Sequence, residues 1–334
     1  MMRAILVLGG GPDQLPAVHA INDLGFCSIV VDSNPDCVSV KYADYFFPVS
    51  NRNPRQIAKI ISSLPDVNVE LVFVIGSDIP HVGSEVSKLL SIDPLIGKNI
   101  AELSIDKLGL KHFLKNKGFL TPEVIEYSNE DILDSTFPCI VKPNKLAGSR
   151  GVFFCSDKYQ LRNNFKKIKN TFPSAQILLE EYVEGIQLST EHVVLNGELM
   201  TYGLALRDYE STRQLLPYII ENGGIQCHPI AMKYLDQVNE LVNRLINALS
   251  ISNGVLKFDL IINYGSDTTS FKEFFPKIQY HDYDKYIQKN SSKELFNEKE
   301  NKRTLVVSIS VFQHIVDFED SLNELLQLNV IEIR

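Results

Sequence analysis

The chain has 334 residues, a formal net charge of −8 and a sequence pI near 5.5. This length predicts two or three packed units, and the acidic balance argues against a nucleic-acid surface, which needs a basic field. No apolar run approaches a membrane span. The five cysteines contain no CxxC pair, so we expect reduced thiols in a cytoplasmic protein.

The first hundred residues alternate between strand and helix patterns. Residues 4–8 form a continuous apolar run, residues 15–24 repeat at helical spacing up to Gly25, and residues 27–31 form a second apolar run. The same reading gives strands over 44–49 and 71–75 and helices over 54–64 and 80–90. This order predicts a small parallel α/β domain over 1–104.

The opening of this domain imitates a dinucleotide fingerprint. Gly9, Gly10 and Gly11 follow the first strand, and Asp32 ends the second strand, where a ribose-binding acid would lie. Gln14 stands where the third glycine of that motif belongs, so helix and strand would pack less closely than the motif needs. An NAD-dependent oxidoreductase therefore remains an alternative that the sequence does not favour.

A glycine-containing hairpin is the central feature of the chain. A helix begins near Asp106, a strand covers 123–127, and 137–154 reads as strand, loop and strand. The loop after Lys142 contains Asn144, Lys145, Gly148, Ser149, Arg150 and Gly151. Glycines let backbone N–H groups approach an anion, so we expect triphosphate there, against the alternative of an ordinary basic surface hairpin.

The remaining segments predict an antiparallel sheet followed by a polar region. Asn196-Gly197 is a type I′ turn signal between strands over 187–195 and 199–206. The long connection over 207–229 is typical of a lid or binding loop. Other expected elements are a helix over 157–171, a strand over 177–183, a helix over 232–249, strands over 255–262 and 270–275, a polar stretch over 280–303, and strand, helix and strand over 305–311, 318–328 and 330–333.

Seven short stretches together resemble the ATP-grasp superfamily, in particular its carboxylate–amine or carboxylate–thiol ligases, including carbamoyl-phosphate-synthase-like members. They occur in order between about residues 3 and 278: VLGGGPDQLPAV, VVDSNPD with YADYFFPVS, SIDKLGLKHFLKNKGFLTP, FPCIVKPNKLAGSRGV, LLEEYVEGIQLSTE, LPYIIENGGIQCHP and GVLKFDLII. The resemblance implies an α/β and α+β protein. A pre-ATP-grasp domain over 1–104 would precede two ATP-clasping lobes over 105–183 and 184–280, with a further segment over 281–334.

The resemblance also implies the nucleotide-binding residues. Lys107 and Lys142 match the two phosphate-binding lysines, although each could instead be a solvated surface lysine. Glu180, which could also be half of an ordinary edge-strand charge pair, matches the segment that reads the adenine edge. The other implied residues are Gly148, Ser149 and Gly151 over the phosphates, the backbones of Glu181 and Val183 at the adenine, and Gln187 where relatives have a ribose-binding Glu.

The implied metal and catalytic residues depart in part from the family pattern. Asp259 and Glu273 match two Mg²⁺-binding acids, although Asp259 could also be a polar position on an exposed strand face. Phe275 replaces the Asn that completes the family's metal site, and a phenyl ring cannot ligate Mg²⁺. The implied catalytic residues are Lys257 and Lys277, each in place of an Arg, and Arg213, which could meet a substrate carboxylate.

Two functions from different classes follow from the resemblance. The first is an ATP- and Mg²⁺-dependent ligase that forms an acyl phosphate from a small carboxylate and passes it to an amine. The second is a degenerate, non-catalytic nucleotide-binding partner or regulator, which Phe275 and Lys277 favour. The resemblance implies small-molecule substrates, no nucleic-acid or membrane partner, and is compatible with a homodimer.

Overall fold

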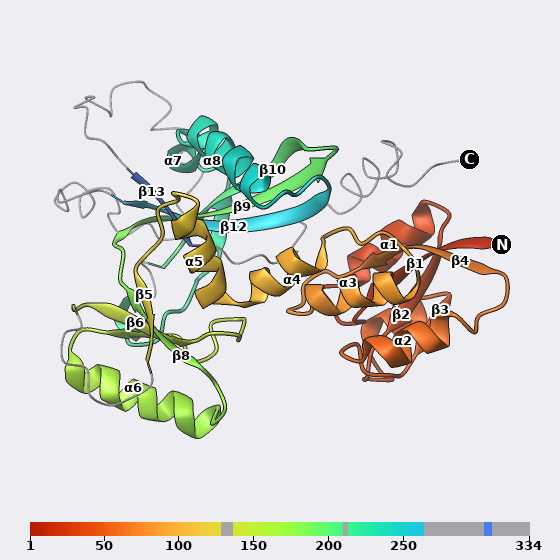
Figure 1. The fold of residues 1–334 in the computed structure, drawn as a ribbon, viewed down its shortest axis with the longest axis horizontal. Coiled ribbons are helices and arrows are strands. Elements are labelled where there is room, and N and C mark those ends of the chain that lie inside the picture. The colour runs from red at the N-terminus through yellow and green to blue at the C-terminus, as the bar shows by residue number, and fades with distance from the viewer. Residues whose placement is uncertain (128–135, 210–212, 264–303, 309–334) are drawn as a thin grey trace, which may run out of the picture.

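The computed structural model describes residues 1–127, 136–209, 213–263 and 304–308. These residues form one parallel sheet and two antiparallel sheets, each covered by helices (Figure 1). The predicted mixture of α/β and α+β architecture is therefore confirmed. The elements expected over 270–275, 318–328 and 330–333, and the site residues Glu273 and Lys277, lie outside the described residues.

The parallel sheet belongs to the first part of the chain, at the red end of Figure 1. Its strand order is β3-β2-β1-β4, and its helices pack on both faces, α1 on one and α2 and α3 on the other. The first elements are β1 (Met2–Leu8), α1 (Leu15–Asp23), β2 (Cys27–Val31), η1 (Val38–Lys41) and β3 (Tyr45–Phe47). They are followed by α2 (Pro54–Ile61), β4 (Val67–Phe73), α3 (Pro80–Leu89) and α4 (Lys98–Ile105). Continuous burial of β2 explains why its sequence is an unbroken apolar run.

The first antiparallel sheet carries the predicted glycine hairpin. Asp106 caps the helix that leads into it, accepting a hydrogen bond from the Gly109 N–H (3.0 Å) as expected. The strand order is β5-β8-β6-β7, and α6 packs on one face through Leu161 and Phe165. The elements are α5 (Lys107–Asn116), β5 (Val124–Glu126), β6 (Cys139–Pro143), β7 (Phe153–Cys155), α6 (Lys158–Thr171) and β8 (Ile177–Glu181).

The second antiparallel sheet has the order β11-β10-β9-β12-β13. Asn196 (φ 51°) and Gly197 (φ 82°) form the predicted tight turn between β9 and β10, with both residues in the left-handed region. Helix α8 packs its apolar stripe on this sheet. The elements are β9 (Gly185–Leu195), β10 (Glu198–Arg207), η2 (Arg213–Leu215), β11 (Gly224–Gln226), α7 (Pro229–Met232), α8 (Leu235–Ala248), β12 (Gly254–Asn263) and β13 (Thr304–Ser308). No helix in the described ranges is long and apolar enough to cross a bilayer.

The long connection after β10 joins the two antiparallel sheets. It contains β11, a strand that its weak apolar pattern did not predict, and it pairs with the edge of β7 through a bridge between Phe153 and Tyr218. The Phe154 N–H donates to the Pro217 carbonyl at 2.9 Å, and the rings of Phe153 and Tyr218 meet edge-on at 5.4 Å. Together these contacts place the segment across the opening between the two sheets.

Candidate functional site

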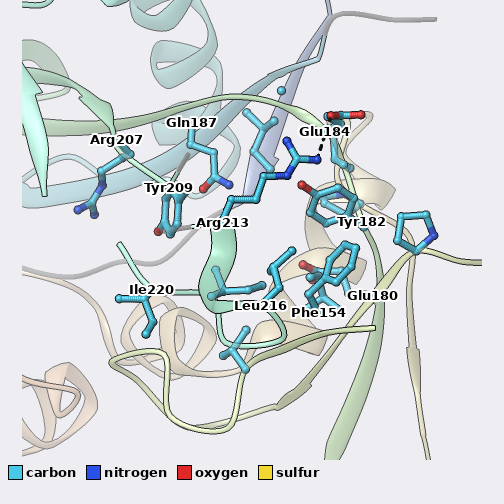
Figure 2. A pocket seen from close by; sticks show the side chains of 18 of the residues that line it. Phe154, Glu180, Tyr182, Glu184, Gln187, Arg207, Tyr209, Arg213, Leu216 and Ile220 are labelled. Atoms are coloured by element: carbon cyan, nitrogen blue, oxygen red, sulfur yellow. Dashed lines mark ion pairs between the residues drawn. The ribbon is translucent and has the colours of Figure 1, made fainter. Parts of the chain in front are cut away.

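A cavity of about 370 Å³ opens between the two antiparallel sheets. Its walls come from the hairpin strands, from the link between β8 and β9, and from the connection after β10 (Figure 2). In Figure 2 Phe154, Leu216 and Glu180 lie on one side of it, and Gln187, Tyr209 and Arg207 lie on the other. Of the predicted nucleotide-binding residues, the wall contains Lys142, Glu180, Glu181, Val183 and Gln187.

Glu180 is a buried carboxylate held by two lysines. The Lys142 ammonium lies 2.8 Å from Oε1 and 2.7 Å from Oε2, and the Lys111 ammonium lies 2.8 Å from Oε2. Although burial opposes ionisation, the positive charges of Lys142 and Lys111 lower the pKa of Glu180 to about 2. Lys142 is only 9% exposed, so it is not the solvated surface lysine of the alternative interpretation.

Lys107 ties helix α5 to the base of the glycine hairpin. Its ammonium donates to the carbonyls of Asn144 (2.8 Å), Leu146 (2.6 Å) and Pro143 (3.3 Å). Burial and the nearby Lys142 charge lower the pKa of Lys107 to about 8. Two predicted phosphate-binding lysines therefore do lie close enough to influence each other electrostatically, at the entrance of the loop.

The glycine loop itself presents backbone donors. Gly148, Ser149 and Gly151 have φ angles of 67°, 54° and 75°, and the Val152 N–H donates to the Ser149 carbonyl at 3.2 Å. The N–H groups of Gly148, Ser149 and Gly151 have no acceptor among the described residues. Open N–H groups beside two lysines are the arrangement that an anion such as phosphate requires.

The glycine run of the first domain is different, because the backbone N–H groups of its glycines already have hydrogen-bond acceptors within the same domain. The N–H groups of Gly9, Gly10 and Gly11 donate to the Val31 carbonyl (2.9 Å), Asp32 Oδ2 (2.8 Å) and Gln14 Oε1 (3.0 Å). A Cβ on Gly10 would lie 2.4 Å from the Cys37 sulfur, so this glycine serves packing. The geometry favours the nucleotide site at the hairpin over the dinucleotide alternative.

One face of the second antiparallel sheet carries two of the predicted site residues, Lys257 and Asp259, in register with polar residues of β9. Asp259 lies opposite Ser189, Lys257 opposite Glu191, and Ile261 opposite Gln187. Alternate residues such as Leu188 and Leu260 face the core under α8, so this polar face is the one turned toward the cavity and its surroundings. Burial and the positive charge of Arg207 lower the pKa of Lys257, although the charges of Asp259 and Glu191 oppose this shift.

Two arginines, Arg207 at the end of β10 and Arg213 in the connection that follows, differ in how deeply their side chains are buried. Arg213, the predicted carboxylate-binding residue, lies in the cavity wall with a half-exposed side chain and pairs with Glu184 at 4.0 Å (dashed in Figure 2). Arg207 is 17% exposed, pairs with Glu221, and lies 3.4 Å from Asp259. The structure therefore brings Arg207, rather than Arg213, to the predicted metal acid.

Asp259 is the one predicted magnesium-binding acid that lies among the described residues. Within those residues no three His, Cys, Asp or Glu side chains come together as a metal cage. Mg²⁺ is commonly held by one or two carboxylates together with phosphate oxygens and water, so the Asp259 oxygens fit a cation that arrives with a nucleotide. The predicted second acid, Glu273, lies outside the described residues.

Sequence reasoning missed three charged residues of the site. Lys111 lies one helical turn after Lys107 and therefore on the same face of α5, a spacing that could have identified it. Arg207 and Glu191 lie on the cavity side of neighbouring strands, as their two-residue alternation with Asp259 and Gln187 across the sheet indicates. The alternation was visible in the sequence, but the strand neighbours were not.

Comparison with known proteins agrees with this geometry. Residues 135–270 match the model of the ATP-grasp domain family. The carbamoyl phosphate synthase large chain of Buchnera aphidicola is 25% identical over 279 residues, which are 76% of this chain and 24% of that protein. The C-terminal section of the same enzyme from Methanopyrus kandleri is 25% identical over 55% of this chain and 37% of that protein. The chain thus spans about a quarter of the length of the large chains that it resembles.

Solved structures share the fold. An L-amino acid ligase from Bacillus licheniformis superposes with a TM-score of 0.64 at 14% identity, over 79% of this chain and 64% of that protein. N5-carboxyaminoimidazole synthetase from Staphylococcus aureus, complexed with ADP, superposes with a TM-score of 0.61 at 17% identity, over 79% and 67%. Residues 135–270 therefore match the ATP-grasp domain, and the described residues share the fold of these ligases, in agreement with the family that the sequence motifs resemble.

Proposed function

We propose that this protein is an ATP-dependent ligase that activates a small carboxylate for attack by an amine. The observation that carries the proposal is the buried Lys142–Glu180–Lys111 cluster beside a glycine loop with open N–H donors. Positive charge and backbone donors at one point offset the charge of phosphates, and phosphoryl transfer depends chiefly on such positioning and electrostatic stabilisation.

The cavity and the glycine loop next to it offer groups that suit the parts of ATP. Ile140, Phe154 and Ile261 offer apolar contact to a base, and the Glu181–Val183 backbone borders the same space. Gln187 has an amide that could bond ribose hydroxyls. Lys107, Lys142 and the Gly148–Gly151 loop would hold the phosphates, and a Mg²⁺ ion held by Asp259 and the phosphates would supply further neutralising charge.

The reaction would proceed in two balanced displacements. A carboxylate oxygen of the first substrate bonds to the γ-phosphorus, the bond from that phosphorus to the β–γ bridging oxygen breaks, and ADP leaves with the electron pair. The amine nitrogen of the second substrate then bonds to the carbonyl carbon of the acyl phosphate. The carbon–oxygen bond to phosphate breaks, inorganic phosphate leaves, and the nitrogen loses a proton. Lys257, Lys277 and Arg213 are the candidates for stabilising the oxygens that gain charge.

The direct test is calorimetric titration of the full chain with ADP and with a non-hydrolysable ATP analogue, with and without Mg²⁺. Mg²⁺-dependent binding followed by ADP release in a screen of carboxylate–amine pairs is the expected result. Absence of nucleotide binding would refute the proposal.

A second candidate is a nucleotide-binding protein without ligase activity. Phe275 in place of the family's metal-binding Asn favours it, because the ring removes an oxygen ligand. This candidate predicts ADP binding that is insensitive to Mg²⁺ and no ADP release with any carboxylate. The same titrations therefore separate the two functions.

A further inference from the structure

Arg207 links two acidic residues at the end of β10. Its Nη1 pairs with Glu221 from the connection that follows, and its Nη2 lies 3.4 Å from Asp259 Oδ1 on β12. A charge-assisted bond between nitrogen and carboxylate is usually 2.7–2.9 Å long, so the Asp259 contact is a loose one. The guanidinium is therefore held mainly by Glu221, and its contact with Asp259 is the weaker of the two.

The Arg207 side chain also borders the candidate nucleotide cavity. It is 17% exposed, and its Nε is buried without a hydrogen-bond acceptor among the described residues. A buried guanidinium nitrogen without an acceptor is costly in an empty site.

A divalent cation and Arg207 compete for the same carboxylate. Asp259 cannot give its oxygen lone pairs to a cation while the positive guanidinium remains at the same oxygen without repulsion between the two charges. The ion pair with Glu221 would keep the Arg207 side chain in place after a cation has bound Asp259.

We propose that Arg207 is a built-in counter-ion of Asp259. In the cation-free protein the Arg207 guanidinium pairs with the Asp259 carboxylate. When a divalent cation binds Asp259, the guanidinium leaves that carboxylate, and its pair with Glu221 keeps Arg207 at the cavity. This inference rests on the proposed function only in assuming that the cation enters with a nucleotide. Cation binding thereby frees one prong of the guanidinium for an anionic ligand, which makes Arg207 a positioning residue that couples the two events.

The experiment measures Mn²⁺ affinity of the full chain by electron paramagnetic resonance, with and without ADP. Arg207→Gln removes the competitor, so the Mn²⁺ dissociation constant is expected to fall by about three- to fivefold, the upper part of the range for a partly exposed ion pair. Arg213→Gln removes a positive charge from the same cavity wall without touching Asp259, and it is expected to leave the constant within about twofold. This matched variant separates specific competition from a general change of charge.

Glu221→Gln should act in the opposite direction. Without its anchor the guanidinium would rest on Asp259 alone, so Mn²⁺ is expected to bind about threefold more weakly. The double variant decides whether Glu221 acts through Arg207 or is itself a ligand. If it acts through Arg207, the double variant matches Arg207→Gln.

A thermal scan supplies a readout that does not depend on nucleotide. Arg207→Gln is expected to lower the Tm of the cation-free protein, because Asp259 and Glu221 lose their shared partner. Added Mn²⁺ is expected to raise the Tm of this variant by more than it raises the Tm of the unaltered protein. Mn²⁺ affinity that is unchanged or weaker in Arg207→Gln would overturn the inference. Failure of the unaltered protein to bind any adenine nucleotide would instead overturn the proposed function, and the two failures are read from different titrations.

Discussion

The protein contains two glycine loops that follow buried strands, and they differ in what their backbone N–H groups do. In the loop over Gly9–Gly11, all three backbone N–H groups donate hydrogen bonds within the first domain, to Val31, Asp32 and Gln14. The loop over Gly148–Gly151 has donors without acceptors among the described residues and stands beside Lys107 and Lys142. Glycine content alone therefore does not identify a phosphate site.

The decisive difference is the charge that surrounds each loop. A carboxylate, Asp32, accepts a hydrogen bond inside the first loop and would repel a phosphate. The carboxylates near the second loop are each paired with a cation: Glu180 with Lys142 and Lys111, Asp106 with Lys145, and Asp78 with Arg150. An anion-binding loop needs free donors and net positive charge at the same place. The following variants are designed to break or sharpen this comparison.

The largest effect is expected for Lys142→Ala. It removes the ammonium that lies at the end of β6 in the cavity wall and pairs with Glu180. ADP affinity should therefore fall by about 100-fold, the effect of truncating one partner of a buried charge pair. Calorimetry with ADP measures the loss. The matching change at the other loop is Asp32→Asn, which should leave ADP affinity unchanged. A loss of ADP affinity in Asp32→Asn would indicate that the nucleotide binds at the first domain instead.

Glu180→Gln is expected to affect stability more than any change near the first loop. It leaves Lys142 and Lys111 without their buried carboxylate, which costs about 3 kcal/mol and lowers the Tm by roughly 10 °C at neutral pH. Because the folded pKa of Glu180, about 2, is below its usual value of 4.5, the carboxylate stabilises the fold above pH 4.5 and this contribution is lost as pH falls toward 2.

Thermal scans of both proteins between pH 7 and pH 2 check this prediction. The Tm difference between the unaltered protein and Glu180→Gln should be largest at neutral pH and should shrink below pH 4.5. A difference that stays constant across that range would show that Glu180 is not held ionised by the lysines.

ADP affinity should fall by about fivefold between pH 7 and pH 9, because Lys107 loses its proton near pH 8 and a neutral amine attracts phosphate less strongly. The effect on stability has the opposite sign. The unfolded chain binds this proton up to pH 10.5, so the contribution of Lys107 to stability rises between pH 8 and pH 10.5. Lys107→Arg keeps its charge over the whole range. Calorimetric titrations at several pH values should therefore show a flat profile for this variant, and a parallel fall in both proteins would exclude Lys107.

Much of this fold followed from the sequence because its elements carry local signals. The apolar run of β2, the Asp106 cap and the Asn196-Gly197 turn each specify their conformation within a few residues. Strand β11 was not predicted, because it has three residues and is defined by its pairing with Arg207 and its neighbours rather than by its own pattern.

The site was predictable where residues sit in a contiguous motif and not where it is assembled across strands. Lys142 and Glu180 were identified through their motifs, and the structure brings them into contact although 38 positions separate them. Arg207 has no local motif, and its approach to Asp259 depends on β10 and β12 both flanking β9. The metal assignment of Glu273 and the role of Lys277 remain predictions, since both lie outside the described residues.

The smallest expected effect tests the open donors of the second loop directly. Gly148 (φ 67°) and Gly25 (φ 77°) are both in the left-handed region, and a Cβ at either would meet nothing within 4 Å. Alanine at either position should therefore cost about 1 kcal/mol of stability from backbone strain alone. Only Gly148→Ala should also weaken ADP binding, by about threefold, because a Cβ and an altered backbone keep the N–H groups from the phosphates. Equal ADP affinity in the two variants would mean that the lysines alone hold the phosphates, and the comparison between the loops would then reduce to their charge.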